Sequence, residues 1–317
     1  MNASIGKDLD FAARLLEQGA LVAVPTETVY GLAGNGLSEE ALLRIFKAKA
    51  RPHFNPLIVH VASVALIASV ADFVSPNAKL LASIFMPGPL TLLLPKSPSV
   101  PDLATAGSSL VAVRVPSHPM MQQLLTRLSF PLAAPSANPF GYISPTSAAH
   151  VAAQLGDQLD YILDGGECVV GLESTIVGFN AHDEVLIYRQ GAVTAEDIER
   201  VTEKKPTLVI ASGKPDAPGM LASHYAPKAK VLLGNIAELL KEHAGNNIAV
   251  LSFQKTQQTA NHQEVLSPTG DLQEAARNLF AALRRLDALN PSMILTELVP
   301  DEGLGRAIND RLRRAAA

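Results

Sequence analysis

The stretch ALVAVPTETVYGLAGNG, residues 20–36, decides the fold that we expect for this chain of 317 residues. Its first part, Ala20–Val24, is a continuous apolar run, which predicts a buried strand that stops at Pro25. Hydroxyl groups and one carboxylate follow directly, at the position where an open α/β sheet binds its ligands. Three glycines in this polar part allow tight backbone turns: Gly31, Gly34 and Gly36. The segment therefore indicates a ligand-binding loop, although it matches neither the P-loop pattern nor the dinucleotide fingerprint.

Helices and further strands alternate along the first two thirds of the chain. Leu9–Gln18 is amphipathic and ends at Gly19, and Glu39–Lys49 begins after Ser38, a typical N-cap residue. Six more apolar runs predict strands: Pro56–Val61, Leu90–Leu94, Val111–Val115, Leu132–Ala134, Tyr161–Leu163 and Ser174–Val177. Several of them adjoin Pro or Gly, which indicates an open α/β sheet whose strand ends carry functional loops.

A second, smaller α/β domain is expected at the C-terminal end of the chain. Residues 203–227 are rich in Lys, Pro, Gly and Ser, a composition typical of a linker. Beyond the linker we expect three strands and one long helix: strands Lys230–Leu233, Ile248–Ser252 and Ser292–Thr296, and helix Asp271–Leu289. The closing Arg311, Arg313 and Arg314 are expected on a solvated helix end.

Composition narrows the class of protein. The longest apolar stretch, Val61–Ala71, is far shorter than the roughly 20 residues of a membrane span, and the N-terminus lacks a secretory pattern. Cys168 is the only cysteine, which excludes an internal disulfide and a thiolate-rich zinc site. A net charge of -4 gives no overall attraction to nucleic acid. We therefore expect a cytoplasmic protein without a membrane segment and without a protein-bound transition metal.

A cationic segment, KARPHFNP, follows the first polar loop. Lys49 and Arg51 end a predicted helix, and Pro52 stops it, which places His53 and Asn55 in the next loop. An isolated pair of cations at a helix end is ordinarily explained by favourable interaction with the helix dipole. Here the pair comes directly after a candidate ligand loop, and positive charges are what a triphosphate needs. We expect both side chains to face the mouth of one site.

Arg114 is the single charge in the apolar run VAVRVP. Burying a guanidinium without an anion is costly, so a partner must be near. The partner could be the carboxylate of an amino-acid ligand or an acidic residue of the chain itself, and the sequence alone favours neither.

Two more polar segments complete the candidate site. AAPSANPFGYISPT contains Ser136, Asn138 and Ser144 between prolines, and LDGGECVVGLESTIV places Glu173 and Ser174 before an apolar strand. A serine hydrolase or carbamoyltransferase that uses Ser136 or Ser174 is one alternative, but the G-x-S-x-G pattern of a nucleophile elbow is absent around Ser136. Hydrogen bonding to a ligand is the favoured role for these hydroxyls.

Together these segments closely resemble the Sua5/YrdC/YwlC family of threonylcarbamoyl-AMP synthases. The resemblance rests on PTETVYGL, KARPHFNPL, AAPSAN, SPT, GLESTIV, RQGAVT and PGMLASHYAP in this order, and it spans most of the chain. It implies an N-terminal YrdC-like domain with an open twisted mixed sheet, residues 1–202, and a linker or lid that contains HYAP, residues 203–229. A Rossmann-like Sua5 domain, residues 230–317, would follow.

The resemblance also implies the reaction. L-threonine, bicarbonate and ATP would give threonylcarbamoyl-AMP and pyrophosphate, which makes the protein a nucleotidyltransferase. The product would pass to a tRNA threonylcarbamoyl-transferase complex for N6-threonylcarbamoyladenosine formation at position 37 of tRNAs that read ANN codons. Mg²⁺ would arrive with ATP.

The family pattern implies roles for particular residues of this sequence. The L-threonine pocket would comprise Thr26, His60, Arg114, Ala134 and Ser174, with Arg114 on the carboxylate. The ATP contacts would be Lys49, His53, Ser136, Ser144, Arg189 and Tyr225. Lys49 and Arg51 would act as catalytic groups that stabilise the phosphates, and Tyr225 would close over the site. Leu110 stands where many relatives carry a small hydroxyl residue.

A protein that binds RNA without catalysis is the second alternative, because the pathway ends on tRNA and weak contact with RNA is compatible with the family. No RNP, KH or aromatic-basic pattern is present, and aromatic residues make up only 5% of the chain. The enzyme is the favoured interpretation.

Overall fold

The computed structural model describes residues 3–209, 217–220, 223–244, 247–257, 260 and 262–317. It divides the chain into two compact units. The first consists of Met1–Phe140, Pro145–Val169 and Glu173–Met220, and the second of Gly141–Ser144, Val170–Leu172 and Leu221–Ala317. The second unit thus takes in two short segments that lie, in sequence, within the first. The predicted domain boundaries at 202/203 and 229/230 stay predictions.

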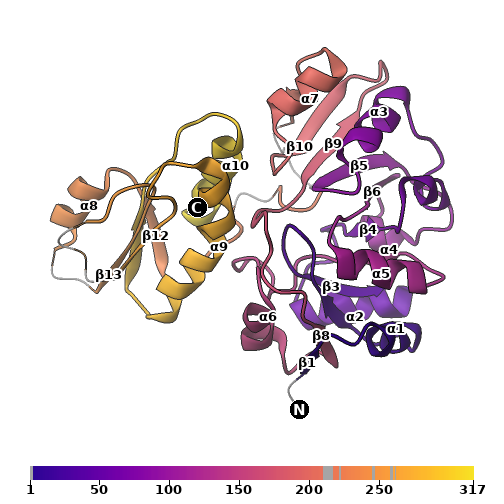
Figure 1. Ribbon diagram of the computed structural model, residues 1–317, viewed down its shortest axis with the longest axis horizontal. Coiled ribbons are helices and arrows are strands. Elements are labelled where there is room, and N and C mark those ends of the chain that lie inside the picture. The colour runs from indigo at the N-terminus through magenta and orange to yellow at the C-terminus, as the bar shows by residue number, and fades with distance from the viewer. Residues whose placement is uncertain (1–2, 210–216, 221–222, 245–246, 258–259, 261) are drawn as a thin grey trace. The chain divides into compact units, whose positions relative to one another are not determined.

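A mixed eleven-stranded sheet forms the first unit (Figure 1). Its strands, in spatial order, are β1 (Ser4–Gly6), β8 (Tyr161–Leu163), β2 (Val22–Val24), β3 (Gly31–Asn35), β7 (Leu132–Ala133), β4 (Ile58–His60), β6 (Leu110–Arg114), β5 (Leu90–Pro95), β9 (Thr175–Phe179), β10 (Val185–Arg189) and β11 (Thr207–Leu208). All seven strands expected here from apolar runs, the one at residues 20–24 included, are confirmed, with ends that differ by up to two residues. The edge strands β1 and β11, the strand β10 beside β11, and β3 were not expected.

The helices of this unit pack mainly on one face of the sheet. They are α1 (Leu9–Glu17), α2 (Glu39–Lys49), η1 (Val64–Ser69), α3 (Pro76–Phe85), α4 (Asp102–Thr105), α5 (Pro119–Arg127), α6 (Ala148–Leu155) and α7 (Ala195–Thr202). Buried residues of α2, α3, α6 and α7 share one core cluster, whereas those of α1 and α5 join a cluster over β2, β3, β7 and β8. The Ser38 cap is confirmed, because its side chain accepts from the Ala41 amide.

On the face of the sheet that α1 and α5 cover, the half formed by β4, β5, β6 and β9 carries no helix among the described residues. The candidate site lies beside this half. The core cluster over β4, β5, β6 and β9 comprises Ile58, Leu93, Ala112 and Ile176, and it is completed by Ala217 and Met220. These last two come from the segment expected to be a linker. The described residues 217–220 therefore lie on the sheet and cover its apolar surface.

The glycine-rich part of the opening stretch is a strand followed by a turn, so the expectation of tight turns was wrong for Gly31 and Gly34 and is confirmed for Gly36. Gly31–Asn35 forms β3, which pairs antiparallel with β2 and β7. A Cβ atom on Gly34 would lie 3.1 Å from Leu21 Cδ2 and 3.2 Å from Ile45 Cδ1. The glycine is needed because neighbouring side chains pack closely against the strand, and no left-handed φ occurs there.

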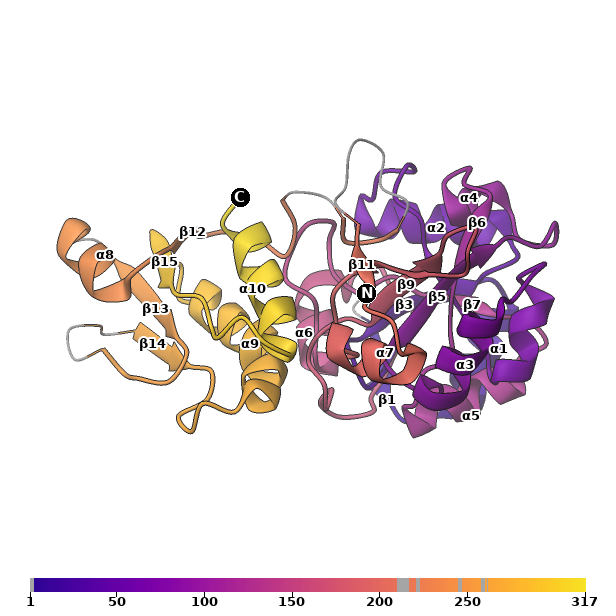
Figure 2. The same ribbon diagram turned by 90° about the horizontal axis from the view of Figure 1, so that it is seen from above.

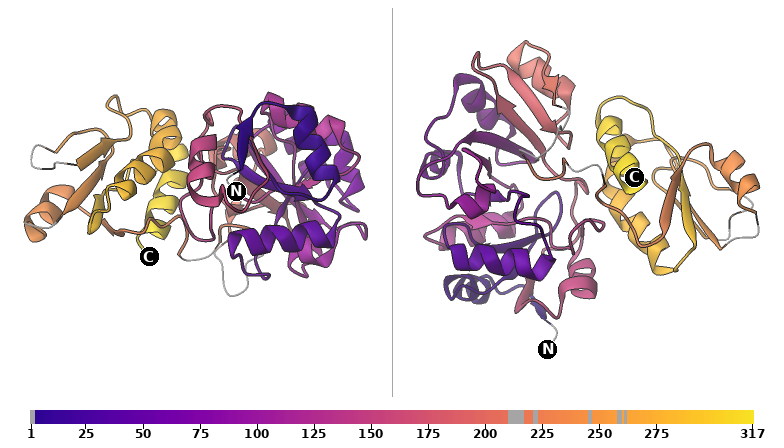
Figure 3. Two further views of the ribbon diagram at one scale, coloured as in Figure 1. Left: turned by 90° about the horizontal axis from the view of Figure 1, so that it is seen from below. Right: turned by 180° about the vertical axis from the view of Figure 1, so that it is seen from behind.

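The second unit contains a four-stranded parallel sheet in the order β12 (Lys230–Leu233), β15 (Met293–Thr296), β13 (Ile248–Ser252), β14 (His262–Val265). Helix α8 (Ile236–Glu242) lies on one side of this sheet, and α9 (Leu272–Ala288) and α10 (Leu304–Ala315) lie on the other (Figures 1 and 2). The views from below and from behind agree (Figure 3). The expected smaller α/β domain is confirmed, and its sheet is parallel.

The C-terminal arginines are not all solvated, so that expectation was wrong for Arg311. Its side chain is 0% exposed, and its guanidinium lies 5.3 Å from the centre of the Tyr225 ring. Arg313 is exposed, as expected. No helix in the described part of the chain is long and apolar enough to cross a membrane.

Candidate active site

Strand ends bring the polar residues of four sequence segments to one edge of the large sheet. His60 and Arg114 are paired neighbours at the carboxyl ends of the parallel strands β4 and β6. Strands β5 and β9 run the opposite way, so Thr91 and Ser174 reach the same edge from their amino ends, where their hydroxyl oxygens lie 2.7 Å apart. All four side chains are buried. This edge adjoins the half of the sheet that carries no described helix.

Arg114 is paired with an acidic residue of the chain itself. Its Nη2 donates to Glu27 Oε1 at 2.6 Å, its Nη1 donates to the Thr28 hydroxyl at 2.9 Å, and its Nε donates to the Gly88 carbonyl at 3.2 Å. Glu27 Oε2 also accepts from the Ser117 amide at 3.1 Å. The internal ion pair, one of the two partners that the sequence allowed, is therefore present. These bonds use three of the five N–H groups of the guanidinium.

Electrostatics fix the protonation states in this cluster. Burial alone raises the pKa of Glu27, but the Arg114 charge and the hydrogen bonds of the pair outweigh burial and hold that pKa below its ordinary value. Burial, and then the Arg114 charge, lower the pKa of His60 to about 3. His60 is thus neutral at pH 7, and its Nδ1 atom has no partner among the described residues. A neutral imidazole nitrogen is available for a hydrogen bond with a ligand.

Arg189 links the threonine-pocket candidate Ser174 to the segment that covers the sheet. Its Nε and Nη2 donate to the Ser174 carbonyl and hydroxyl at 3.0 Å and 3.1 Å, and its Nη1 donates to the Pro218 carbonyl at 3.3 Å. Gly191 follows directly, and a Cβ there would collide with the backbone of residues 173–175. The Ser174 hydroxyl contacts Thr91 and Arg189 and no imidazole among the described residues, which argues against a serine nucleophile.

Lys49 and Arg51 are buried, in contrast to the expectation of two cations at an open mouth. Lys49 Nζ donates to the carbonyls of Ser136 and Asn138, and it is 1% exposed. Arg51 donates to the carbonyls of Asn55 and Pro56 at 3.2 Å and 2.8 Å. Burial, with the Arg51 charge second, lowers the pKa of Lys49. The structure brings Lys49 to the Ser136 loop, and phosphate contact by either cation stays a prediction.

The other predicted site residues differ in their settings. Ala134 is buried beside β4, where its amide donates to the Ile58 carbonyl at 3.1 Å, and Thr26 bonds the Thr28 hydroxyl at 2.8 Å. Ser136 is partly exposed, and its backbone bridges to Gly31. His53 is exposed, with its ring 4.9 Å from that of Phe46.

Two predicted ATP contacts belong to the second unit. Ser144 is fully buried there, and Tyr225 is 1% exposed, with its ring 5.6 Å from Phe280 and 5.3 Å from the Arg311 guanidinium carbon. The ring of Tyr225 therefore packs within the C-terminal unit. Its expected closure over ATP stays a prediction, and residues 210–216 and 221–222 of the proposed lid lie outside the described residues.

Sequence reasoning missed three features of the site. Thr91 could have been noticed as the only hydroxyl in an apolar strand, and Glu27, the one carboxylate of the polar loop, could have been named as the partner of Arg114. Asn55 is fully buried, and neither of its amide atoms has a partner among the described residues. Nothing in the sequence pattern predicts this burial.

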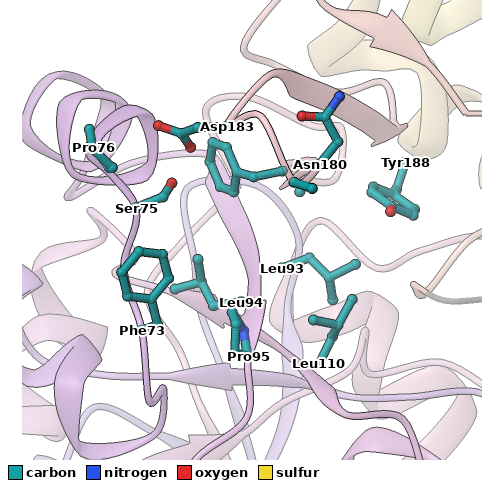
Figure 4. Close-up of a pocket in the computed structure, with 13 residues that line it drawn as sticks. Phe73, Ser75, Pro76, Leu93, Leu94, Pro95, Leu110, Asn180, Asp183 and Tyr188 are labelled. Atoms are coloured by element: carbon teal, nitrogen blue, oxygen red, sulfur yellow. The ribbon is translucent and has the colours of Figure 1, made fainter.

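An apolar cavity lies farther along the same sheet face (Figure 4). Its volume is about 290 Å³, and its walls include Leu93, Leu110, Gly178 and Tyr188. Leu110 lies four residues from Arg114 on β6, a distance of about 13 Å along a strand. The face therefore offers charged groups at one end and apolar space at the other.

The Arg114–Glu27 pair predicts a pH-dependent contribution to stability. Because the folded-state pKa of Glu27 is depressed, this contribution is complete above the ordinary pKa of 4.5 and is lost as the pH falls through the folded value. We expect Glu27→Gln to lower the free energy of unfolding by about 3 kcal/mol at pH 7, because Arg114 then lacks its buried anion. Urea denaturation of both proteins at pH 7, 5 and 4 measures this difference, which should shrink below pH 4.5.

Asp10→Asn is the control for this prediction, because the Asp10–Arg127 pair is exposed and contributes little. A difference between wild type and Glu27→Gln that stays constant from pH 7 to pH 4 would contradict the assignment.

Comparisons with known proteins agree with this architecture. A family model described as telomere recombination, for Sua5, YciO and YrdC proteins, matches residues 14–191, and one described as the C-terminal domain of threonylcarbamoyl-AMP synthase matches residues 193–317. The chain is 41% identical to a threonylcarbamoyl-AMP synthase of Pyrococcus abyssi over 96% of this chain and 93% of that protein. It is 38% identical to one of Bacillus subtilis over 96% and 92%.

A solved structure has the same fold over its whole length. The crystal structure of P. abyssi Sua5 complexed with L-threonine matches with a TM-score of 0.93 and 38% identity, covering 100% of this chain and 98% of that chain. The sequence resemblance is thereby confirmed. The chain belongs to the threonylcarbamoyl-AMP synthase family, in the form that joins a Sua5/YciO/YrdC domain to a Sua5 C-terminal domain.

Proposed function

We propose that this protein converts L-threonine, bicarbonate and ATP into threonylcarbamoyl-AMP and pyrophosphate, and that the product serves formation of N6-threonylcarbamoyladenosine in tRNA. The observation that carries the proposal is the buried cluster of His60, Arg114 and Ser174 at one sheet edge. It combines a cation, a neutral imidazole and a hydroxyl, which are the groups that an amino acid with a hydroxyl side chain can use.

In this proposal L-threonine binds with its carboxylate on Arg114. Glu27 and Thr28 hold the guanidinium in place, and two of its N–H groups are left for the ligand. The free Nδ1 of His60 and the hydroxyls of Ser174 and Thr26 surround the remaining polar groups, with the Ala134 methyl as an apolar wall. A fixed guanidinium loses little freedom when the carboxylate binds, which favours affinity.

ATP is assigned to residues of other loops. Its proposed contacts are Lys49, His53, Ser136, Ser144, Arg189 and Tyr225, and the apolar cavity beside Leu93 and Leu110 would take the adenine ring. This set supplies positive charge and hydroxyls and contains no carboxylate. It fits Mg²⁺ that is held by the phosphates themselves, and it would supply no protein ligands for a metal cage.

The chemistry follows from these assignments. A threonylcarbamate oxygen attacks the α-phosphorus, a P–O bond to that oxygen forms, and the bond to pyrophosphate breaks. Such a transfer depends on positioning and on stabilisation of negative charge, for which Lys49 and Arg51 are assigned as the catalytic groups. No covalent nucleophile is required.

The packing of residues 217 and 220 on the sheet supports the proposal that this part of the chain acts as a lid. Ala217 and Met220 pack on Ile58 and Ala112, and Arg189 holds the Pro218 carbonyl. A lid that closes here would exclude water from a carbamate intermediate. Cytoplasmic location, transfer of the product to a tRNA threonylcarbamoyl-transferase complex and weak RNA contact complete the proposal.

Threonine-dependent release of pyrophosphate tests the function. The full-length protein is incubated with ATP, labelled bicarbonate and one amino acid at a time. Release should occur with L-threonine and should fall by about 100-fold or more with L-valine, because the buried hydroxyls that bond threonine would then be unpaired. Equal release with every amino acid, or none with threonine, would remove the assignment, and tight RNA binding without turnover would favour the RNA-binding alternative.

A Lys49→Met variant tests the assignment of Lys49 to the ATP site. Lys49 Nζ binds the carbonyls of the Ser136 loop, so its loss removes both a positive charge and the support of that loop. We expect kcat/KM for ATP to fall on the order of 100-fold. Lys47→Met is the matched control, since Lys47 is exposed on the same last turn of α2 and should keep full activity. Full activity of Lys49→Met would take Lys49 out of the site.

A further inference from the structure

The second unit contains a contact network between helix α9 and the segment Gly141–Ser144. Arg284 of α9 donates through Nε to the Ser144 carbonyl at 3.3 Å and through Nη2 to the Ile143 carbonyl. Its guanidinium carbon lies 5.2 Å from the centre of the Tyr142 ring. One buried side chain thus contacts three consecutive residues of the segment.

Asp287, one turn later on α9, completes the network. It accepts from the Tyr142 hydroxyl at 2.5 Å and from the Ala229 amide at 2.9 Å, and it is 4% exposed. Burial raises the pKa of Tyr142, and the Asp287 carboxylate raises it further, so the phenol keeps its proton and remains the donor. We call Tyr142, Arg284 and Asp287 the α9 clamp.

The segment Gly141–Ser144 is also bonded to the HYAP motif and is partly buried. Gly141 has a left-handed φ of +82°, and its carbonyl accepts from the Ala226 amide of the HYAP motif at 2.9 Å. Ile143 and Ser144 are both 0% exposed. Buried carbonyls require hydrogen-bond donors, and Arg284 supplies donors to those of residues 143 and 144. The backbone at Ser144 is therefore positioned by a side chain about 140 residues later in the sequence.

We propose that Arg284 and Asp287 are positioning residues that hold Ser144 in the orientation in which it binds ATP. This inference rests on the proposed function in one respect, the assignment of Ser144 to ATP. It gives the C-terminal domain a defined task. Affinity for ATP should depend on the clamp, whereas affinity for L-threonine should not, because no residue of the threonine pocket belongs to the clamp.

The test uses the full-length protein and a non-hydrolysable ATP analogue, with calorimetric titration as the readout. Arg284→Lys keeps the charge but cannot reach two carbonyls with a planar fork, and it should weaken analogue binding about tenfold while leaving the Kd for L-threonine within twofold. Arg285→Lys is the matched control, since Arg285 is the next residue of α9, is exposed and pairs with Glu264. It should bind both ligands as the wild type does.

A double-variant cycle distinguishes positioning from general support of the fold. If Arg284 acts through Ser144, then Ser144→Ala and the combined Ser144→Ala, Arg284→Lys variant should bind the analogue equally weakly. Unchanged analogue binding by Arg284→Lys, equal weakening of both ligands, or additive effects in the double variant would each overturn the proposal.

If Arg284→Lys does not fold, Tyr142→Phe replaces it in the binding test. It removes only the hydroxyl that donates to Asp287 and should weaken analogue binding in the same selective way. The readout is binding, so the proposal can fail while the wild type still releases pyrophosphate with threonine. Conversely, the clamp can be established by selective loss of analogue binding even if that assay fails.

Discussion

The buried ion pair between Arg114 and Glu27 is the interaction on which the site depends. Both side chains are at most 6% exposed, and removal of one partner from such a pair typically costs about 3–5 kcal/mol. The pair joins the loop after β2 to the end of β6, and the Thr28 and Gly88 contacts fix the guanidinium further. The same charge helps to keep His60 neutral. One interaction thus sets the geometry of the loop and the protonation of its neighbours.

The sheet explains why the polar segments converge. Strands β4 and β6 are parallel, whereas β5 and β9 run antiparallel to them, so carboxyl ends and amino ends meet at one edge. The adjoining face is covered by residues 217 and 220. In the proposed function, movement of this covering segment, whose described residues 217–220 belong to the first unit, would admit ATP to the site.

Much of the fold and of the candidate site could be predicted from the sequence, and each feature that could not has a physical reason. Apolar runs predicted the interior strands because buried strands lack charge, but β10 and β11 escaped notice because β10 alternates between buried and partly exposed residues and β11 has only two, both exposed. Gly34 was assigned to a turn because a glycine can be required either by a turn or by close packing, and the sequence does not distinguish the two. Arg311 was assigned to solvent because its partner, Tyr225, is more than 80 residues away in sequence. The role of α9 could not be predicted for the same reason.

In the proposed function, Arg114, held by Glu27, binds the carboxylate of L-threonine. The most direct measurement compares the Kd of L-threonine with that of L-threoninamide, in which a neutral carboxamide replaces the carboxylate, by calorimetric titration of the wild-type protein. Because a charge-assisted bidentate contact would be lost, the amide should bind at least about 30-fold more weakly. Equal affinity for the two compounds would show that the carboxylate does not bind Arg114 and would contradict the account.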